Sequence, residues 1–430
     1  MFDFTEKIYW AIKDRRPHRQ FGEAPRLCVV NLPRPSPRWG IEVYSRLGWL
    51  AETDQEFGAL HLLEHYLAGS IREVVTHPAH TNGHVGMDRM GFEADFHRDQ
   101  AASLVETYLD GLFRPKWHRQ DLLAYERDSI LNEMNVKTHD LEYAIFRAVT
   151  KQRFAPGSRY GRASVESLDS TLALSLDDIV NTYKRWRESP LVVFLWGHQL
   201  PATLVDRVRR YLEACELKPW QKTTWPAVDY STKQIELRPD PSIRGVYISL
   251  SFPAGTHQDP DRDLLAQRRL GQFITSNHPK SGFRRLREQG IYFFRYEAAR
   301  FGDAGFWIFH SYCTCEQLPK TLGAIAEVWR EVKKNSVPEG YLLDLKKESH
   351  FAIEREWYHN DSRYDWIVSD VLENEPIKTI AQEKAVVNSV TSQVISEVAN
   401  RTLDSTKLNL TLTGDVQGLD QQAINTALEF

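Results

Sequence analysis

Two histidines and a glutamate within five residues are the side chains of this chain best suited to chemistry. The stretch reads His61-Leu-Leu-Glu64-His65. In a helix, His61 and His65 lie one above the other on one face, and Glu64 projects beside them. Two neutral imidazoles can hold zinc, and a nearby carboxylate can take a proton from the water that the metal activates. The order inverts the common His-Glu-x-x-His signature, so it predicts a zinc site.

The surrounding residues indicate that the pentapeptide lies on a helix. Asp54 is suited to cap its N-terminus, and leucines at positions 60, 63 and 67 form an apolar stripe. Gly69 is expected to end the helix. The alternative is a pair of ordinary histidines on an amphipathic helix.

Two glutamates downstream are candidates to complete such a site, because a catalytic zinc usually takes three protein ligands. Glu126 and Glu133 are seven residues apart, which is two helical turns, so both carboxylates share one face. Glu133 would supply the oxygen ligand, and Glu126 would orient a ligand imidazole. The alternative for such a pair is a solvated acidic helix face.

These residues resemble a known family, the pitrilysin–insulysin type metallopeptidases, which include the mitochondrial processing peptidase. That family pairs Gly-x-x-His-x-x-Glu-His with a later Glu-Arg-x-x-x-x-x-Glu. Residues 58–65 and 126–133 match the two patterns. The resemblance implies one Zn²⁺ per chain. It assigns His61, His65 and Glu133 as metal ligands, Glu64 as the general base and Glu126 as the supporting carboxylate.

A strand after the zinc motif is the expected substrate-binding element. The family's edge strand carries Asn-Ala-x-Thr, and residues 81–86 read Thr-Asn-Gly-His-Val-Gly. An edge strand exposes unpaired backbone groups to which an extended peptide can add. The resemblance therefore assigns substrate binding to Asn82, Gly83 and His84. An alternative is a second metal site formed by His77, His80 and His84.

The second half of the chain offers further site residues. Residues 283–294 resemble the family's Leu-Arg-Glu-x-x-Gly-Leu-x-Tyr segment, although one residue is missing before Gly290. By this resemblance, Arg287 would bind the substrate or the tetrahedral intermediate, and Tyr292 would donate to the oxyanion. The alternative is a basic helix end packed on an aromatic strand.

A faint internal repeat predicts the fold. Residues 40–48 and 245–255 both read as strands that lead into a helix, and the zinc pentapeptide aligns with residues 268–272, which contain no ligand. We expect an α+β protein of two homologous domains, each a mixed or antiparallel sheet packed with helices, repeating after about 210 residues. The predicted boundaries are 1–218 for the zinc domain, 219–232 for a linker and 233–430 for the inactive domain.

Composition limits the other function classes. The chain has 430 residues and a net charge of −4, and no basic block indicates a nucleic-acid partner. No segment is apolar enough to predict a membrane helix, and the N-terminus does not resemble a signal peptide. Four cysteines do not form a disulfide framework, so a cytoplasmic location is expected.

The sequence as a whole predicts a zinc endopeptidase that cleaves unfolded peptides or short polypeptides in an enclosed chamber. Processing the leader of a ribosomally made peptide is one candidate role. The alternatives are a non-catalytic or presenting subunit of a family heterodimer, and a metal-binding scaffold without turnover. Because two domains leave a cleft open to water, we expect a homodimer, or a heterodimer with a sequence-related chain.

Overall fold

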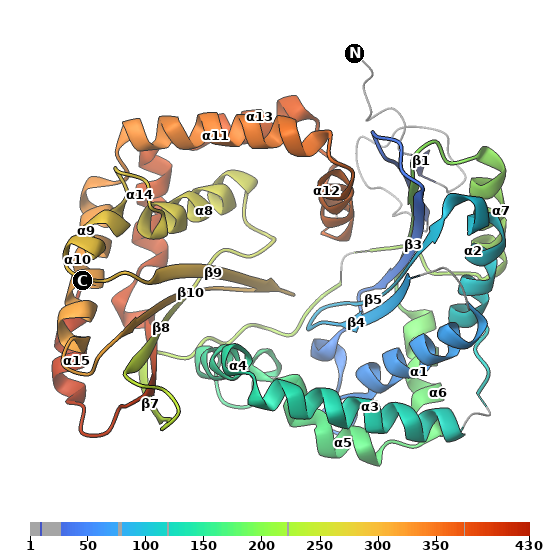
Figure 1. The fold of residues 1–430 in the computed structure, drawn as a ribbon, viewed down its shortest axis with the longest axis horizontal. Helices are drawn as coiled ribbons and strands as arrows, with labels where there is room; N and C mark the ends of the chain where they lie inside the picture. Colours follow the sequence, from blue (N-terminus) through green and yellow to red (C-terminus); the bar gives the residue numbers. More distant parts are fainter. Residues whose placement is uncertain (1–8, 11–26, 76–79, 118–119, 222, 374) are drawn as a thin grey trace. The chain divides into compact units, whose positions relative to one another are not determined.

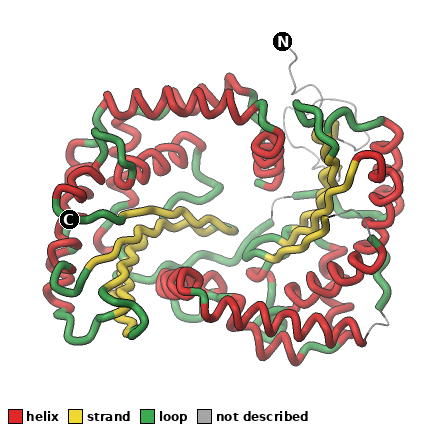
Figure 2. Tube along the Cα trace, viewed as in Figure 1, coloured by secondary structure: helices red, strands yellow, loops and turns green. Residues whose placement is uncertain are grey.

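Two sheets, each covered by helices, organise the computed structural model (Figures 1 and 2). The structure describes residues 9–10, 27–75, 80–117, 120–221, 223–373 and 375–430. Each sheet belongs to one compact unit. Unit 1 comprises Met1–Lys137, Ser164–Trp225 and Glu354–Ile380, and unit 2 comprises Thr138–Ala163, Pro226–Ile353 and Ala381–Phe430.

The sheet of unit 1 has six strands in the order β1-β2-β6-β3-β5-β4. Its strands pair antiparallel except for β2 and β6, which run parallel. The strands are β1 (Tyr9–Trp10), β2 (Leu27–Asn31), β3 (Arg38–Ser45), β4 (His80–Val85), β5 (Met90–His97) and β6 (Leu191–Gly197).

The sheet of unit 2 has five strands in the order β7-β11-β8-β10-β9, again with one parallel pair, β7 with β11. The strands are β7 (Gln234–Pro239), β8 (Val246–Pro253), β9 (Phe294–Phe301), β10 (Ala304–Cys313) and β11 (Asn409–Gly414). Without β1, the two sheets have the same order and the same strand directions. This topology confirms the predicted α+β class and the internal repeat.

Helices cover both sheets. Unit 1 holds α1 (Ala59–Val74), α2 (Arg98–Phe113), α3 (Gln120–His139, of which the last two residues fall in unit 2), α5 (Leu168–Ala173), α6 (Leu176–Glu188), α7 (Ala202–Ala214) and α12 (Asn360–Leu372). Unit 2 holds α4 (Leu141–Arg153), α8 (Asp261–Thr275), α9 (Gly282–Glu288), α10 (Leu318–Asn335), most of α11 (Glu339–Trp357), nearly all of α13 (Ile380–Ser389), α14 (Ser392–Thr402) and α15 (Gln421–Ala427). Short 3₁₀ turns are η2 (Trp49–Ala51), η3 (Arg159–Gly161), η4 (Ser164–Ser167) and η5 (Ser405–Lys407).

Two helices belong to the unit of the opposite half of the sequence. The predicted division at residues 218 and 233 is linear, whereas α4 lies in unit 2 and α12 in unit 1. The side chain of Gln152 in α4 donates to the carbonyl of Leu410 (3.1 Å), and Arg153 donates to the carbonyl of Ser251 (3.0 Å). Such exchanged segments depend on contacts far apart in sequence, which the local patterns used for the boundaries do not report.

The two faces of the unit 1 sheet carry different cores. Side chains alternate between faces along a strand. In β2, Leu27 and Val29 belong to the core that includes α1 and α2, whereas Cys28 and Val30 belong to a second core with α12. The helix α12 therefore covers the face of the sheet away from the zinc motif (Figure 1).

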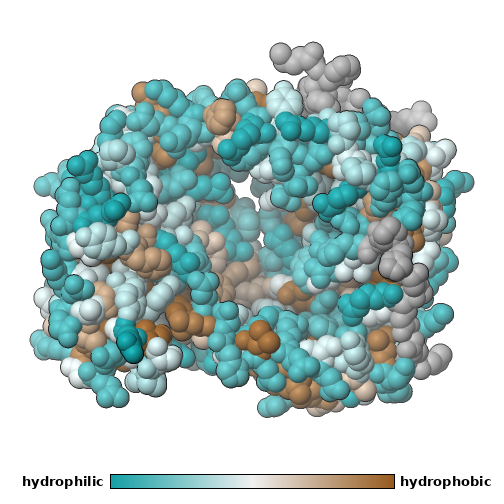
Figure 3. Space-filling model, viewed as in Figure 1, coloured by the Kyte–Doolittle hydropathy of each residue, from teal (hydrophilic) through white to brown (hydrophobic). Residues whose placement is uncertain are grey.

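The visible surface is mainly hydrophilic, with scattered hydrophobic side chains (Figure 3). No helix within the described residues combines the length and apolar character needed to cross a bilayer.

Candidate metal centre

The helix that carries the zinc motif is fixed at its start by a buried glutamate. Helix α1 begins after Gly58, which adopts φ 97° and has no side-chain cap of its own. The carboxylate of Glu52, 1% exposed, accepts hydrogen bonds from the backbone amides of Gly58 (3.1 Å) and Leu60 (2.7 Å). This carboxylate satisfies amides that a helix start leaves without partners. The prediction that Asp54 caps the helix is therefore wrong, because Glu52 accepts the hydrogen bonds from the start of the helix.

Gly69 lies inside α1 and does not end it, which corrects a second expectation. The helix runs on to Val74. A Cβ at Gly69 would lie 2.5 Å from Glu126 Oε1, so the glycine leaves room for this carboxylate of α3. The glycine marks a close approach between two helices.

The three predicted ligands converge. Glu133 Oε2 lies 3.4 Å from His61 Nε2 and 3.2 Å from His65 Nε2, and the three candidate ligand atoms all lie within 4.8 Å of one another. The imidazole rings meet edge to face, with centroids 4.9 Å apart. Helix α1 supplies both histidines and α3 supplies the glutamate. Helical spacing accounts for the pairing of the two histidines, and the approach of Glu133 agrees with the ligand set that the resemblance implied.

This donor set fits zinc. Zinc bonds to His nitrogen and carboxylate oxygen are about 2.0–2.1 Å long, so neighbouring ligand atoms of a tetrahedral ion lie about 3.3 Å apart. The two nitrogen–oxygen distances to Glu133 match that separation. Two imidazoles and one carboxylate also leave a fourth position open, as catalytic zinc sites do.

Glu126 contacts His65, one of the candidate ligands, as expected for a carboxylate that would orient this imidazole. Its Oε2 lies 3.1 Å from His65 Nδ1, and the residue is 1% exposed. Because an ionised carboxylate only accepts, Nδ1 carries the proton and Nε2 is directed to the metal position. The other oxygen of Glu126 accepts from Arg72 Nη2 at 2.9 Å.

Two cations beside the site were missed by the sequence reasoning. Arg72 pairs with Glu126, and Lys137 Nζ lies 2.5 Å from Glu133 Oε1. Both carried a signal: Arg72 stands seven residues, two helical turns, after His65, and Lys137 stands four residues after Glu133. Together they balance the negative charge of the two glutamates.

The metal-free cluster holds protons tightly. Burial lowers the pKa of His65, but the hydrogen bonds to Glu126 and Glu133 outweigh burial and raise that pKa to about 9. The hydrogen bonds from His61 and His65 hold the pKa of Glu133 well below its usual range, against the effect of burial. A metal bound here would therefore replace a proton on His65.

Glu64 lies beside the ligands and against the edge strand. Its Oε2 is 3.8 Å from His65 Nε2, and the residue is 7% exposed. Burial raises the pKa of Glu64, although His65 and His61 oppose the shift. A raised pKa brings a carboxylate closer to the pH at which it can accept a proton and return it. A Cβ at Gly83 of β4 would overlap Glu64 Oε1, so glycine is needed at this contact.

The other residues predicted on β4 face away from the metal position. Asn82 Nδ2 donates to Glu93 Oε1 at 3.0 Å, and the His84 ring lies 5.7 Å from the Tyr44 ring. Both belong to the sheet face opposite Gly83, because side chains alternate along a strand. Their role in substrate binding stays a prediction.

The alternative of a second metal site gains no support from the described residues. His77 lies outside them. His80 and His84 are four residues apart on one strand, about 13 Å along it, which is too far for one ion. The only group of metal-binding side chains found among the described residues is His61, His65 and Glu133.

The residues predicted in the second half lie in unit 2. Arg287 lies in the last turn of α9, is exposed and donates from Nη1 to Asn277 Oδ1 at 3.3 Å. Tyr292 follows α9 and is 75% exposed. Their catalytic roles stay predictions.

Part of the sequence matches a known family model. Residues 173–348 match the Peptidase M16 inactive domain. The candidate ligands and Glu64 lie outside this stretch, which begins after α3. No curated protein sequence matches the chain significantly.

Solved structures match nearly the whole chain. The first half of the periplasmic protease PqqL from Escherichia coli gives a TM-score of 0.77 at 12% identity, covering 95% of each chain. A protease from Helicobacter pylori gives 0.75 at 12% identity, covering 90% of this chain and 96% of that one. A peptidase M16 inactive domain from Pseudomonas fluorescens gives 0.76 at 14% identity, covering 93% and 98%.

Such low identities show the fold alone. The protein therefore has the two-unit fold found in M16-like peptidases, and the fold prediction is confirmed. Whether the chain is a peptidase depends on its own residues.

Proposed function

We propose that the protein is a zinc-dependent endopeptidase. The observation that carries the proposal is the convergence of His61 Nε2, His65 Nε2 and Glu133 Oε2, with the buried carboxylate of Glu64 beside them. The peptidase-like fold supports it. All five residues required by the inverted zinc motif and its acidic partner are present.

The chain's own residues would divide the work of hydrolysis. Zinc held by the two imidazoles and Glu133 would supply Lewis-acid activation of water and of the scissile carbonyl. Glu64 accepts a proton from the attacking water and then gives it to the leaving amine. Glu126 keeps the proton of His65 on Nδ1, and Arg72 holds the other oxygen of Glu126.

The proposed substrate is an unfolded peptide or short polypeptide. Strand β4 is the last strand of its sheet, and the side of β4 away from β5 is not paired within that sheet. An extended peptide can add there as another strand. Gly83 would bring the peptide backbone close to Glu64. Removal of a leader peptide is one use that fits such a substrate.

A non-catalytic subunit is the second candidate, because residues 173–348 match a domain described as inactive. The candidate zinc ligands and Glu64 lie outside that stretch and are all present, which favours a catalytic role. We also propose that the active form is a dimer, as a homodimer or with a sequence-related chain, because an enclosed site excludes water.

Zinc analysis and peptide hydrolysis test the proposal together. We expect about one zinc per purified chain and cleavage of unfolded peptides such as a tryptic digest of casein. The Glu64→Gln variant should keep its zinc and lose hydrolysis by a factor on the order of 10²–10⁴. Bound zinc without cleavage, by the chain alone or as a dimer, would support the non-catalytic alternative. Unchanged cleavage by Glu64→Gln would remove Glu64 from the mechanism.

A further inference from the structure

A lysine that the zinc patterns of the sequence do not contain lies against the candidate metal centre. The acidic pattern ends at Glu133, and Lys137 stands about one helical turn later on the same face of α3. Its Nζ lies 2.5 Å from Glu133 Oε1. Within the described residues, no other lysine or arginine contacts this carboxylate. Lys137 is therefore placed to influence how Glu133 meets a metal.

The two oxygens of Glu133 have different partners. Oε2 lies 3.4 Å from His61 Nε2 and 3.2 Å from His65 Nε2, whereas Oε1 is held by Lys137. A carboxylate that bound a metal through both oxygens would place the ion on the oxygen that the ammonium already holds. Two cations on one oxygen repel each other, so the ammonium opposes this arrangement. Glu133 is thus set to offer a single oxygen.

Glu133 needs such a contact more than the other glutamate of α3 does. The side chain of Glu126 is 1% exposed and is fixed by His65 and Arg72. The side chain of Glu133 is 34% exposed, so burial alone does not fix its carboxylate. Ordering a partly exposed side chain costs conformational entropy. The contact with Lys137 offsets part of that cost before a metal binds.

We propose that Lys137 is a positioning residue of the metal centre, which reserves Oε1 of Glu133 so that only Oε2 binds zinc. The inference rests on the proposed zinc site and adds a residue to it. One oxygen from Glu133 and one nitrogen from each imidazole leave a fourth position for water. A second bond from Glu133 would occupy that position or add a fifth ligand. Lys137 thereby keeps the position open.

Stability alone does not explain this contact. Lys137 is 37% exposed, and ion pairs four residues apart on an exposed helix face contribute little to the free energy of unfolding. We therefore expect Lys137→Met to fold normally, with little change in the urea concentration at which the metal-free protein unfolds. The effect of the substitution should appear at the metal.

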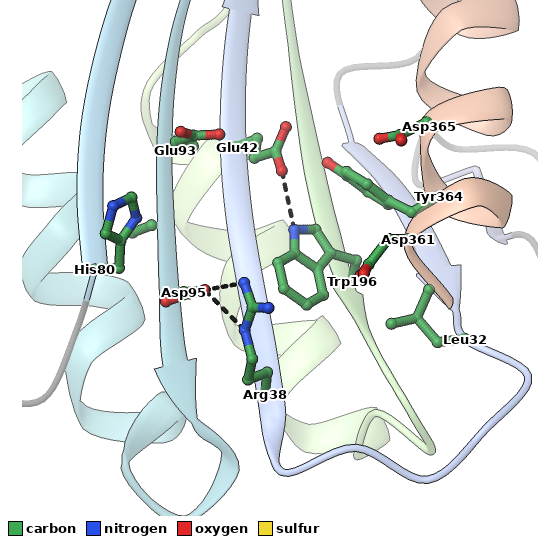
Figure 4. Close-up of a pocket in the computed structure, with 11 residues that line it drawn as sticks. Leu32, Arg38, Glu42, His80, Glu93, Asp95, Trp196, Asp361, Tyr364 and Asp365 are labelled. Carbon is green, nitrogen blue, oxygen red and sulfur yellow. Dashed lines mark hydrogen bonds and ion pairs between the residues drawn. The ribbon is translucent and has the colours of Figure 1, made fainter. Parts of the chain in front are cut away.

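An ion pair elsewhere in unit 1 provides a matched control. Arg38 of β3 donates from Nε to Asp95 Oδ2 at 2.9 Å, beside the cavity between the sheet and α12 (Figure 4). This is the sheet face opposite the zinc motif. Arg38→Met removes one positive charge from unit 1, as Lys137→Met does, but it removes that charge from a carboxylate that is not a candidate ligand.

Cobalt(II) in place of zinc tests the inference without hydrolysis. The full chain is stripped of metal and loaded with cobalt, whose visible absorption is stronger in four-coordinate than in five-coordinate sites. We expect a strong, four-coordinate spectrum from the wild type and from Arg38→Met. Lys137→Met should give a weaker, five-coordinate spectrum, because Oε1 of Glu133 becomes free to bind. Lys137→Arg keeps a cation beside Glu133 and should retain the wild-type spectrum.

X-ray absorption of the zinc-loaded proteins gives a second readout on the natural metal. We expect about four nitrogen and oxygen neighbours in the wild type and about five in Lys137→Met. Identical coordination in these two proteins, five-coordinate metal in the wild type, or the same change in Arg38→Met would overturn the inference. Failure of the proposed function is distinguishable, because it appears as absence of bound cobalt and zinc in every protein, the wild type included.

Discussion

The two units have the same strand order, but they differ where a helix meets the edge strand of the sheet. At this contact, the glycine and the large side chain have exchanged places. In unit 1, α1 brings Glu64 against Gly83 of β4; in unit 2, α8 brings Gly271 against Tyr296 of β9. The strand register makes Gly83 and Tyr296 equivalent, because each pairs with the same position of the next strand. The large side chain comes from the helix in one unit and from the strand in the other.

This exchange explains how the same fold presents a carboxylate beside the edge strand in unit 1, whereas an aromatic ring fills the equivalent space in unit 2. The Tyr296 ring occupies the space beside Gly271, where a Cβ would lie 2.5 Å from it, and its hydroxyl donates to the carbonyl of Arg268 at 3.2 Å. The strand of unit 1 contributes no side chain there, so a carboxylate can face an incoming peptide. The difference between the units lies in the side chains and not in the backbone arrangement.

Removal of a ligand should have the largest effect on this comparison. Glu133→Ala leaves two imidazoles for zinc, and we expect loss of both bound metal and hydrolysis, measured by metal analysis and peptide cleavage. The matched control is Gln272→Ala, because Gln272 of α8 aligns with His65 in the repeat. Full zinc content in Glu133→Ala would mean that another residue is the third ligand.

Making unit 1 resemble unit 2 should abolish turnover while sparing the metal. In Gly83→Tyr, the ring would displace Glu64, and we expect hydrolysis to fall by about 10²-fold or more, since small misplacements of a catalytic group cost that much. Zinc content should persist, because Glu64 is not a ligand. The control is Gly86→Ala on the same segment, where an added Cβ would meet only the Arg89 carbonyl oxygen, at 3.6 Å. Normal activity in Gly83→Tyr would contradict the assigned position of Glu64.

The carboxylate behind His65 should have a smaller effect. Glu126→Gln weakens the acceptor for His65 Nδ1, and we expect zinc affinity to fall about 10–100-fold in competition with a chelator. Arg72 is half-exposed, and Arg72→Gln leaves the contact between Glu126 and His65 in place, so its effect should stay below about fivefold. A larger loss of zinc affinity in Arg72→Gln than in Glu126→Gln would contradict the proposal that Glu126 supports His65 directly and Arg72 only through Glu126.

The histidines of the two units should give opposite pH dependences in the metal-free protein. The folded-state pKa of His65 is raised to about 9, so its contribution is complete below about pH 6.5 and is lost as pH rises through 9. Burial, with a smaller effect of Arg295, lowers the pKa of His310 to about 4, so stability falls as pH drops from about 6.5 toward 4.

Urea unfolding from pH 4 to 9.5 checks both signs. We expect His65→Gln to flatten the alkaline side and His310→Gln the acid side, each by on the order of 1–3 kcal/mol. Saturating zinc should reverse the alkaline trend, because binding requires a neutral imidazole. An alkaline trend unchanged by His65→Gln would show that other groups cause it.

The sequence by itself determined which side chains of the candidate metal centre share a helix face, and it showed the repeat. His61, His65, Glu126 and Glu133 lie at helical spacings, and a helix fixes which residues share a face within one or two turns. The repeat was readable because the strands and helices recur in the same order with similar boundaries. These features depend on local periodicity, which the sequence carries directly.

Tertiary structure alone decided the contacts between distant segments. The cap from Glu52, the room that Gly69 leaves for Glu126 and the placement of α12 against the unit 1 sheet all join residues whose pairing no local pattern specifies. The cavity between the unit 1 sheet and α12 arises in the same way, because Glu42 and Asp361 come from opposite halves of the chain. Packing brings such groups together only after the sheets and helices have formed, so their spacing along the sequence gives no sign of it.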